Sequence, residues 1–270
     1  MATDDVAPLL PTRMVDHIPV MWKEPQRAEG ASVALWLPAL GLSKEGVAPF
    51  LDDLAGAGFV AVSFDLWQHG ERGTEPPEEI RARVFGAYRR FKWPILGQTT
   101  LDALRVIDWA FDSLGAGPSV VAGGISLGGE AAVALAGIDH RVERVAAIVA
   151  SPDWTSPGMH GFDDPAKPLP QGHADAYAQW LFDRLDPLTH LDAYFHGPAI
   201  AFECGQEDFH VPVDGALHFR EARRDHYPDA AERVRVSDHP GIDHLEGIRS
   251  VELHQRSLAW LSDPQPAQAA

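Results

Sequence analysis

The sequence predicts a single α/β domain built on a doubly wound, mostly parallel β-sheet. Apolar runs of strand length, such as 32–37 and 59–64, alternate along the chain with stretches whose apolar residues recur at helical spacing. A continuous apolar run is typical of a strand buried on both faces, as strands are in parallel sheets covered by helices. With 270 residues, 45% of them hydrophobic, the chain is long enough to bury one such core.

The first third of the chain begins this alternation. Residues 14–22 alternate imperfectly between apolar and polar and predict an opening strand or hairpin at the edge of the sheet. The run 32–37 predicts a buried strand, and the helical spacing that follows in 47–54 stops at two glycines. The next buried strand is expected at 59–64, and it runs into the polar loop 65–73.

One basic cluster lies in an otherwise acidic sequence. Its cations fall between apolar residues whose spacing places them on one helical face, and we interpret the basic side as a solvated face of that helix. The cations are Arg81, Arg83, Arg89, Arg90 and Lys92. Because 39 acidic residues outnumber 22 basic ones and the formal charge is −17, we do not expect binding to nucleic acid or to an anionic membrane.

The central part of the chain carries the most specific motif. A helix is expected at 100–114 and a buried strand at 119–122, and Gly-Ile-Ser-Leu-Gly (124–128) joins that strand to a helical pattern beginning at Leu127. A serine held between glycines in a tight strand-to-helix turn is typical of a nucleophile elbow, which would expose the hydroxyl of Ser126. The helix N-terminus would point backbone N–H groups at the same space, where negative charge develops during acyl transfer.

Residues 151–190 depart from the alternation after a further buried strand expected at 144–150. The segment is rich in Pro, Gly, His and Asp and is too long for a simple connection. We therefore expect a small insertion or cap over the strand ends, partly helical at 174–185. Large apolar residues in and near the segment either line an apolar substrate pocket or belong to ordinary core. They are Trp67, Trp154, Met159, Phe162 and Trp180.

The C-terminal third resumes the alternation. Two more strands and two more helices are expected there, in the order strand, helix, strand, helix, at 198–203, 213–224, 233–237 and 245–261. The single domain would then span residues 1–262. A tail of Pro, Ala and Gln at 263–270 is expected to be disordered.

Loops at the expected strand ends carry the partners that a serine nucleophile needs. A serine hydroxyl reacts only when a base takes its proton, and the base needs a carboxylate to hold its tautomer. In a parallel sheet such groups meet at the carboxyl ends of the strands. Asp208 lies just past the strand at 198–203, and His244 precedes the closing helix. His239 and His210 are alternative bases, but His239 precedes a proline close to the strand end, whereas His244 lies in a loop bracketed by glycines.

From residues 32 to 261 the sequence resembles α/β-hydrolases of the dienelactone hydrolase and prolyl-oligopeptidase-like esterase group, which share the chain order Ser, Asp, His. The matching pieces are 40–45, Asp65 with 69–72, 124–128, 205–212 and 241–244. The resemblance implies that Ser126 is the nucleophile, that His244 is the general base and acid, and that Asp208 is the orienting carboxylate.

The resemblance also implies an oxyanion hole formed by the backbone N–H groups of Leu40 and Leu127. Pro38-Ala39 stands where the family usually has His-Gly before the first of these donors. Asp153 and Glu207 are alternative acids. The pattern Gly-x-x-Asp-x-x-Val-Pro matches the family and favours the aspartate chosen above.

We expect a cytoplasmic serine esterase that hydrolyses a small or medium carboxylic ester through an acyl-enzyme. Thioesterase, lactone hydrolase, peptidase or carbon–carbon hydrolase activity, or ligand binding without catalysis, are the alternatives on the same fold. No cofactor, metal or membrane is expected, because the histidines lack Cys or Glu at ligand spacing and no apolar run is long enough to cross a bilayer. The single cysteine, Cys204, agrees with a reducing compartment. The oligomeric state is left open.

Overall fold

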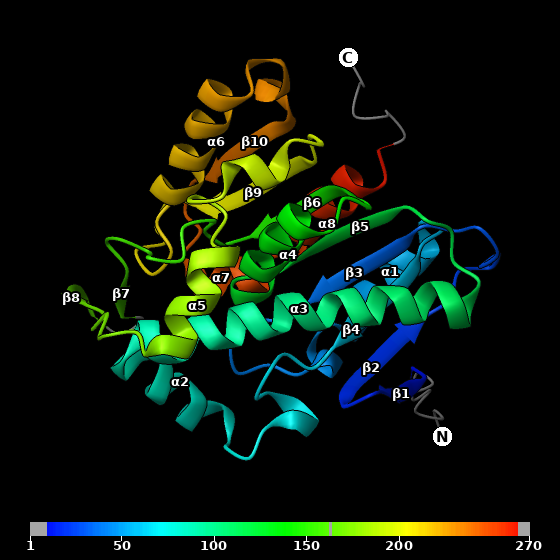
Figure 1. Cartoon of the computed structure of the whole chain (residues 1–270), viewed down its shortest axis with the longest axis horizontal. Coiled ribbons are helices and arrows are strands. Elements are labelled where there is room, and N and C mark those ends of the chain that lie inside the picture. The colour runs from blue at the N-terminus through cyan, green and yellow to red at the C-terminus, as the bar shows by residue number, and fades with distance from the viewer. Residues whose placement is uncertain (1–9, 162–163, 264–270) are drawn as a thin grey trace, which may run out of the picture.

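An eight-stranded sheet runs through the centre of the molecule (Figure 1). The computed structural model describes residues 10–161 and 164–263. Strands β1 and β2 form an antiparallel hairpin at one edge, β2 pairs antiparallel with β4, and all other neighbours in the sheet are parallel. In spatial order the strands are β1 (Thr12–Val15), β2 (Ile18–Lys23), β4 (Val60–Phe64), β3 (Val33–Leu37), β5 (Val120–Ile125), β6 (Val142–Ile148), β9 (Ala199–Gly205) and β10 (Val234–His239).

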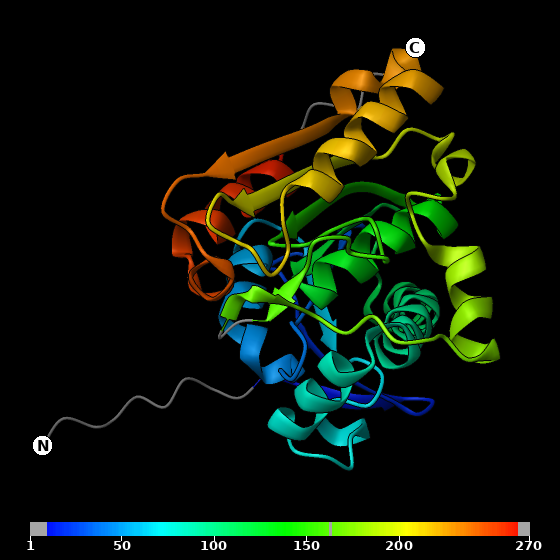
Figure 2. The same ribbon diagram turned by 90° about the vertical axis from the view of Figure 1, so that its left-hand side faces the viewer.

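Helices cover both faces of the sheet, which Figure 2 shows nearly edge-on. They are α1 (Ala48–Gly56), α2 (Pro77–Gly86), α3 (Tyr88–Leu114), α4 (Leu127–Ile138), α5 (Ala176–Leu185), α6 (Asp214–His226), α7 (His244–Arg249) and α8 (Val251–Leu261). Short 3₁₀ turns lie at η1 (Lys44–Val47), η2 (Gly70–Arg72), η3 (Leu191–Tyr194) and η4 (Pro228–Arg233). Strands β7 (His160–Gly161) and β8 (Asp164–Pro168) form a separate small hairpin.

The core consists of two apolar layers, one on each face of the sheet. Alternate residues of β3 divide between them: Leu35 packs in the layer that α3 and α4 cover, and Trp36 packs in the layer that α1 and α8 cover. This two-sided burial explains why β3, β4 and β5 appear in the sequence as continuous apolar runs. The predicted doubly wound, mostly parallel α/β fold is confirmed.

Two helix predictions need correction. The basic stretch is not one helix, because extended backbone at Ala87 separates α2 from α3, and the carbonyls of Pro170 and Gln171 accept the first N–H groups of α3. The closing helix is also two helices. Ser250 has extended backbone, and its hydroxyl accepts the N–H of Leu253 at 3.3 Å, so it caps α8 after α7 has ended.

The segment 151–190 lies beside α3 and carries β7, β8 and α5. Helix α5 packs directly on α3 at Gly97, where a Cβ atom would lie 2.8 Å from the side chain of Leu181. The predicted helix at 174–185 matches α5, whose first turn is capped by the side chain of Asp175. Most of the tail expected to be disordered, 264–270, lies outside the described residues.

A buried ion pair joins α3 to α4 and overturns the interpretation of Lys92 as part of a solvated face. The side chain of Lys92 is 5% exposed and that of Glu130 is 1% exposed, and the ammonium lies 2.6 and 2.8 Å from the two carboxylate oxygens. Lys92 also donates to the hydroxyl of Tyr88. Burial lowers the pKa of Lys92, but Glu130 and Tyr88 raise that pKa more, so it lies above its ordinary value and the lysine is charged.

Replacing Lys92 with Met is expected to destabilise the protein by about 3–5 kcal/mol, because the change leaves the carboxylate of Glu130 buried without its counter-ion. The double variant Lys92→Met/Glu130→Leu is expected to recover most of this loss. Urea unfolding measures both.

The matched control is Lys23→Met, which breaks an exposed 3.0 Å pair with Asp52. This change is expected to cost less than about 1 kcal/mol. An equal effect of Lys92→Met and Lys23→Met would contradict the interpretation of the buried pair.

Candidate active site

Ser126 lies at the tip of the turn between β5 and α4. Its φ of 51° and ψ of −119° form a strained conformation that residues other than glycine rarely adopt. Two backbone hydrogen bonds hold it there, since its N–H donates to the carbonyl of Ile148 at 2.8 Å and its carbonyl accepts the N–H of Glu130 at 3.0 Å. The turn therefore presents the hydroxyl at the carboxyl edge of the sheet.

Two glycines allow the backbones around this turn to approach closely. A Cβ atom on Gly128 would lie 2.3 Å from the carbonyl oxygen of Leu37, and one on Gly124 would lie 2.6 Å from the carbonyl carbon of Gly128. Backbone atoms cannot rotate away as a side chain can. Only glycines at these positions let the first turn of α4 pack against the ends of β3 and β5.

Ser126, His244 and Asp208 form a hydrogen-bonded chain. The Nε2 atom of His244 lies 3.1 Å from Oγ of Ser126, and Nδ1 lies 2.7 Å from Oδ2 of Asp208. A carboxylate can only accept, so Nδ1 carries the proton and Nε2 accepts the hydroxyl of Ser126. The second oxygen of Asp208 accepts the N–H of Val211 at 2.7 Å, which fixes the carboxylate. All three side chains are buried.

The loop after β10 positions His244 as the first residue of α7. Asp243 caps this helix: its carboxylate accepts the N–H of Glu246 at 2.8 Å, and its own N–H donates to the carboxylate of Glu246 at 3.1 Å. This capping box orients the start of the helix and hence the histidine.

Three of the four alternative residues weighed from the sequence have other partners or face solvent, and only His210 lies beside His244. Nε2 of His239 lies 2.6 Å from a carboxylate oxygen of Glu203, and Oδ1 of Asp153 accepts from the N–H and the hydroxyl of Thr155. Glu207 is exposed. His210 packs edge-on against His244, with ring centroids 4.7 Å apart, and lines the cavity described next.

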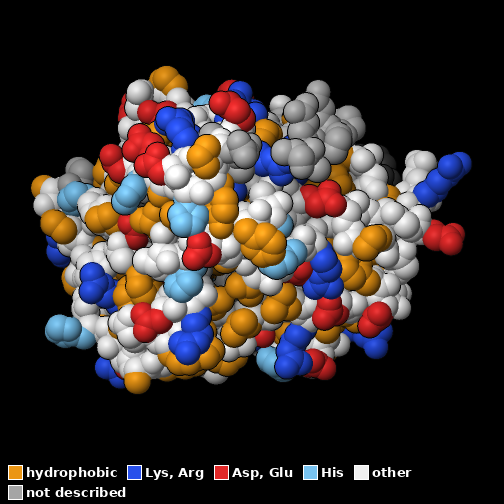
Figure 3. Space-filling model, turned by 45° about the horizontal axis from the view of Figure 1, so that its top comes forward, with side chains coloured by type: hydrophobic (Ala, Val, Ile, Leu, Met, Phe, Trp, Pro, Cys, Tyr) orange, Lys and Arg blue, Asp and Glu red, His pale blue; other side chains and the backbone are white. Residues whose placement is uncertain are grey.

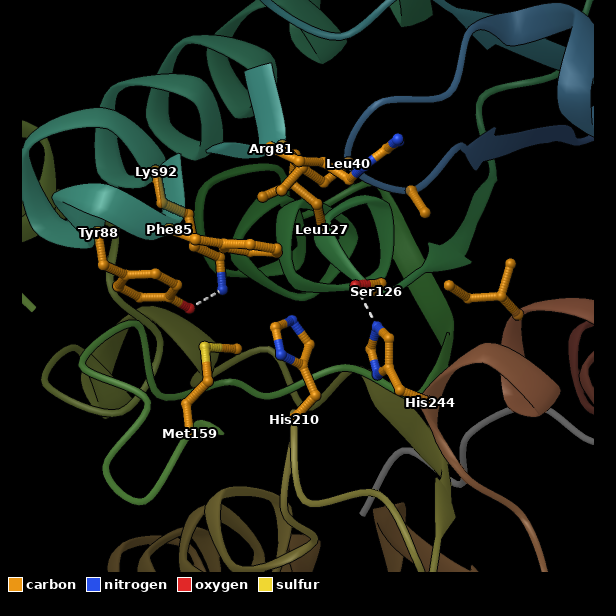
Figure 4. A pocket seen from close by; sticks show the side chains of 12 residues that line it. Leu40, Arg81, Phe85, Tyr88, Lys92, Ser126, Leu127, Met159, His210 and His244 are labelled. Carbon is orange, nitrogen blue, oxygen red and sulfur yellow. Dashed lines mark hydrogen bonds between the residues drawn. The ribbon is translucent and has the colours of Figure 1, made fainter. Parts of the chain in front are cut away.

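A cavity of about 30 Å³ opens beside Ser126 (Figure 4). Its walls come from the loop after β3, from α2 and α3, from the start of α4, and from the loops that carry Met159 and His210. The lining residues are Ala39, Leu40, Arg81, Phe85, Tyr88, Lys92, Ser126, Leu127, Met159, His210, His244 and Ile248.

Both predicted oxyanion donors, Leu40 and Leu127, line this cavity. Leu127 is the first residue of α4, where a helix leaves its N–H without an acceptor inside the helix. Leu40 lies in a turn closed by the N–H of Leu42, which donates to the carbonyl of Ala39 at 3.0 Å. Within 10–161 and 164–263, no hydrogen bond from either leucine N–H is found.

Of the five predicted pocket residues, Met159 lines the cavity, the three tryptophans do not, and Phe162 lies outside the described residues. Trp154 is fully buried, and its backbone accepts from Trp93 of α3 and donates to Asp186. Trp67 lies under the guanidinium of Arg72. Trp180 is 48% exposed on α5. These rings pack on or beside α3 and α5 instead, a placement that spacing along the chain does not reveal.

Sequence reasoning missed the wall formed by α2 and α3. Phe85, Tyr88 and Lys92 face the cavity because the chain bends at Ala87 and brings the ends of both helices over Ser126. The only signal was the apolar spacing inside the basic stretch, which indicated a buried face but not what that face covers.

In the described part of the chain, no group of three His, Cys, Asp or Glu residues is arranged to hold a metal ion, and no helix is long and apolar enough to cross a bilayer. On the face in Figure 3, Lys and Arg side chains are scattered among acidic and apolar ones rather than gathered in one patch.

The chain matches no protein-family model and no curated protein, but solved structures resemble it. TT1662 from Thermus thermophilus is 26% identical, with a TM-score of 0.71 over 97% of this chain and 99% of its own. A protein assigned as a dienelactone hydrolase from Klebsiella pneumoniae is 17% identical, with a TM-score of 0.61 over 91% and 93%. Esterase 2 of Thermogutta terrifontis, solved as the sarin-phosphonylated protein, is 17% identical, with a TM-score of 0.55 over 96% and 94%. These similarities show that the chain has the α/β-hydrolase fold, as its resemblance to dienelactone hydrolases predicted.

Proposed function

We propose that the protein is a serine hydrolase that cleaves small carboxylic esters through an acyl-enzyme. The observation that carries the proposal is the hydrogen-bonded chain from Asp208 through His244 to the strained Ser126. Each member has the partner that its role requires, since the serine faces a base and the base faces a carboxylate.

In this mechanism Ser126 attacks the ester carbonyl while His244 takes the hydroxyl proton. Asp208 stabilises the resulting imidazolium through Nδ1–H. The N–H groups of Leu40 and Leu127 stabilise the oxyanion, and His244 then protonates the leaving alcohol. Water activated by the same histidine hydrolyses the acyl-enzyme and regenerates the serine.

The cavity supports a short acyl group as substrate. The cavity beside Ser126 is small, at about 30 Å³, which favours a short acyl group over a long chain. Phe85 and Met159 are apolar walls that suit the acyl part of such an ester. Among the three structures reported above, one is named an esterase and one a dienelactone hydrolase, which agrees with ester or lactone cleavage.

A fluorophosphonate probe tests the nucleophile directly. Esterase 2 of T. terrifontis is phosphonylated by sarin, and we expect one covalent label per chain here, seen as a single mass increase of the intact protein. Ser126→Ala is expected to abolish both the label and the turnover of p-nitrophenyl acetate. A wild-type protein that takes no label and turns over no ester would exclude the proposed activity.

The role of Asp208 is tested by Asp208→Asn. An amide cannot hold the Nδ1–H tautomer or stabilise the imidazolium, so we expect kcat for p-nitrophenyl acetate to fall by about three to four orders of magnitude. The neighbouring exposed carboxylate provides the control, because Glu207→Gln is expected to leave kcat near its wild-type value. Similar turnover by the two variants would argue against Asp208 as the orienting group.

The size of the acyl pocket is tested by Met159→Ala. Met159 is buried against the cavity, and its truncation adds space for further methylene groups. We expect the ratio of kcat/KM for p-nitrophenyl butyrate over acetate to rise by roughly tenfold or more. Met14→Ala, on an exposed residue at the far edge of the sheet, is the control and is expected to leave this ratio unchanged.

A further inference from the structure

His210 is a second buried histidine at the nucleophile, and the mechanism above does not use it. It lies two residues after Asp208, is 4% exposed, and lines the same cavity as Ser126. Its ring packs edge-on against both His244 and Phe85, with centroids 4.7 and 5.2 Å away. These contacts hold the imidazole in one orientation beside the base.

The hydrogen bonds of His210 determine its tautomer. Nδ1 lies 2.7 Å from the carbonyl oxygen of His160, which can only accept, so Nδ1 carries a proton. Burial, and then the proximity of His244, lower the pKa of His210 to about 2, so the ring is neutral at any working pH. Nε2 of His210 is therefore a hydrogen-bond acceptor.

Figure 4 shows the other ring nitrogen of His210 pointing into the cavity, in the space between Ser126 and Lys92. The cavity volume of about 30 Å³ exceeds the 10–15 Å³ or so that one water molecule needs. With the two histidine rings 4.7 Å apart, a single water can lie within hydrogen-bond distance of Nε2 of both.

We propose that His210 orients the water that hydrolyses the acyl-enzyme, by accepting a hydrogen bond from the O–H group whose proton this water does not transfer to His244. The proposal rests on the proposed esterase function and adds a group that acts in its second half. Once Ser126 is acylated, its hydroxyl proton is gone and Nε2 of His244 can accept from water instead. One O–H of the water then points at His244 and the other at His210.

The step balances without any further reactant. The water oxygen forms a bond to the acyl carbon while one water proton moves to Nε2 of His244. The tetrahedral intermediate then collapses as the bond to Oγ of Ser126 breaks, and the same proton moves from His244 to that oxygen. His210 only accepts a hydrogen bond throughout, and the carboxylic acid leaves with the second proton.

This role distinguishes water from an alcohol as the acyl acceptor. Methanol has a single O–H, which it must offer to His244, so it has no proton to offer to His210. Loss of Nε2 of His210 as a hydrogen-bond acceptor is therefore expected to slow hydrolysis of the acyl-enzyme and to leave methanolysis nearly unchanged.

Two substitutions separate the acceptor atom Nε2 of His210 from the hydrogen bond that its Nδ1 donates to His160. In His210→Asn, the amide nitrogen is separated from Cα by the same number of bonds as Nδ1 of histidine. It can therefore still donate to the carbonyl of His160, but no atom replaces Nε2. In His210→Gln, the amide group stands where Nε2 was, and the donor to His160 is lost instead.

The experiment measures how the acetyl-enzyme formed from p-nitrophenyl acetate partitions between water and added methanol, as the ratio of methyl acetate to acetic acid. For His210→Asn we expect this ratio to rise roughly tenfold, the effect of one hydrogen bond lost from the hydrolytic transition state. We also expect p-nitrophenol to appear in a burst, because deacylation becomes slower than acylation. His210→Gln is expected to lie closer to wild type in both measurements.

An unchanged ratio in His210→Asn, or an equal change in both variants, would overturn the role of His210. Fluorophosphonate labelling separates this outcome from failure of the proposed function. If wild type and His210→Asn are both labelled at Ser126 and the ratio does not move, only the inference about His210 fails. If wild type is not labelled, the esterase proposal fails with it.

Discussion

The site depends on the direct packing of α4 against the ends of β3 and β5. Because Gly124 and Gly128 carry no side chain, the first turn of α4 contacts backbone atoms of Leu37, and this contact holds Ser126 at a φ of 51°. The same packing places Leu127 at the helix start and Leu40 across the cavity. The candidate nucleophile and both candidate oxyanion donors thus lie around this one packing contact.

The buried charged side chains around this turn are paired with other groups of the fold. Lys92 is neutralised by Glu130, one helical turn after Ser126, and Asp208 is satisfied by His244 and by a backbone N–H. Leaving either carboxylate unpaired would cost several kcal/mol. His210 stays neutral beside them. These pairs give the cavity fixed hydrogen-bonding directions, which suit the transient charges of the proposed ester cleavage.

Much of this arrangement could be predicted before any coordinates. The apolar runs at 32–37 and 59–64 lie at β3 and β4, and the glycines around Ser126 indicated a strand-to-helix turn. Asp208 and His244 were selected because each follows a strand at the carboxyl edge, and the structure brings both side chains to Ser126. Local composition and topology suffice for such positions, because parallel strands end at a common edge.

The sequence by itself determined where along the chain the strands of the parallel sheet lie, the turn at Ser126 and the loops that bear its partners. Each of these leaves a local pattern, either in the spacing of apolar residues or in the spacing of glycines. Only the tertiary structure decided what encloses the serine. The bend at Ala87, the burial of Lys92 against Glu130 and the approach of His210 and Met159 join segments far apart in the chain. The three tryptophans predicted for the pocket lie elsewhere, because a large apolar side chain carries no local mark of which neighbour it will meet.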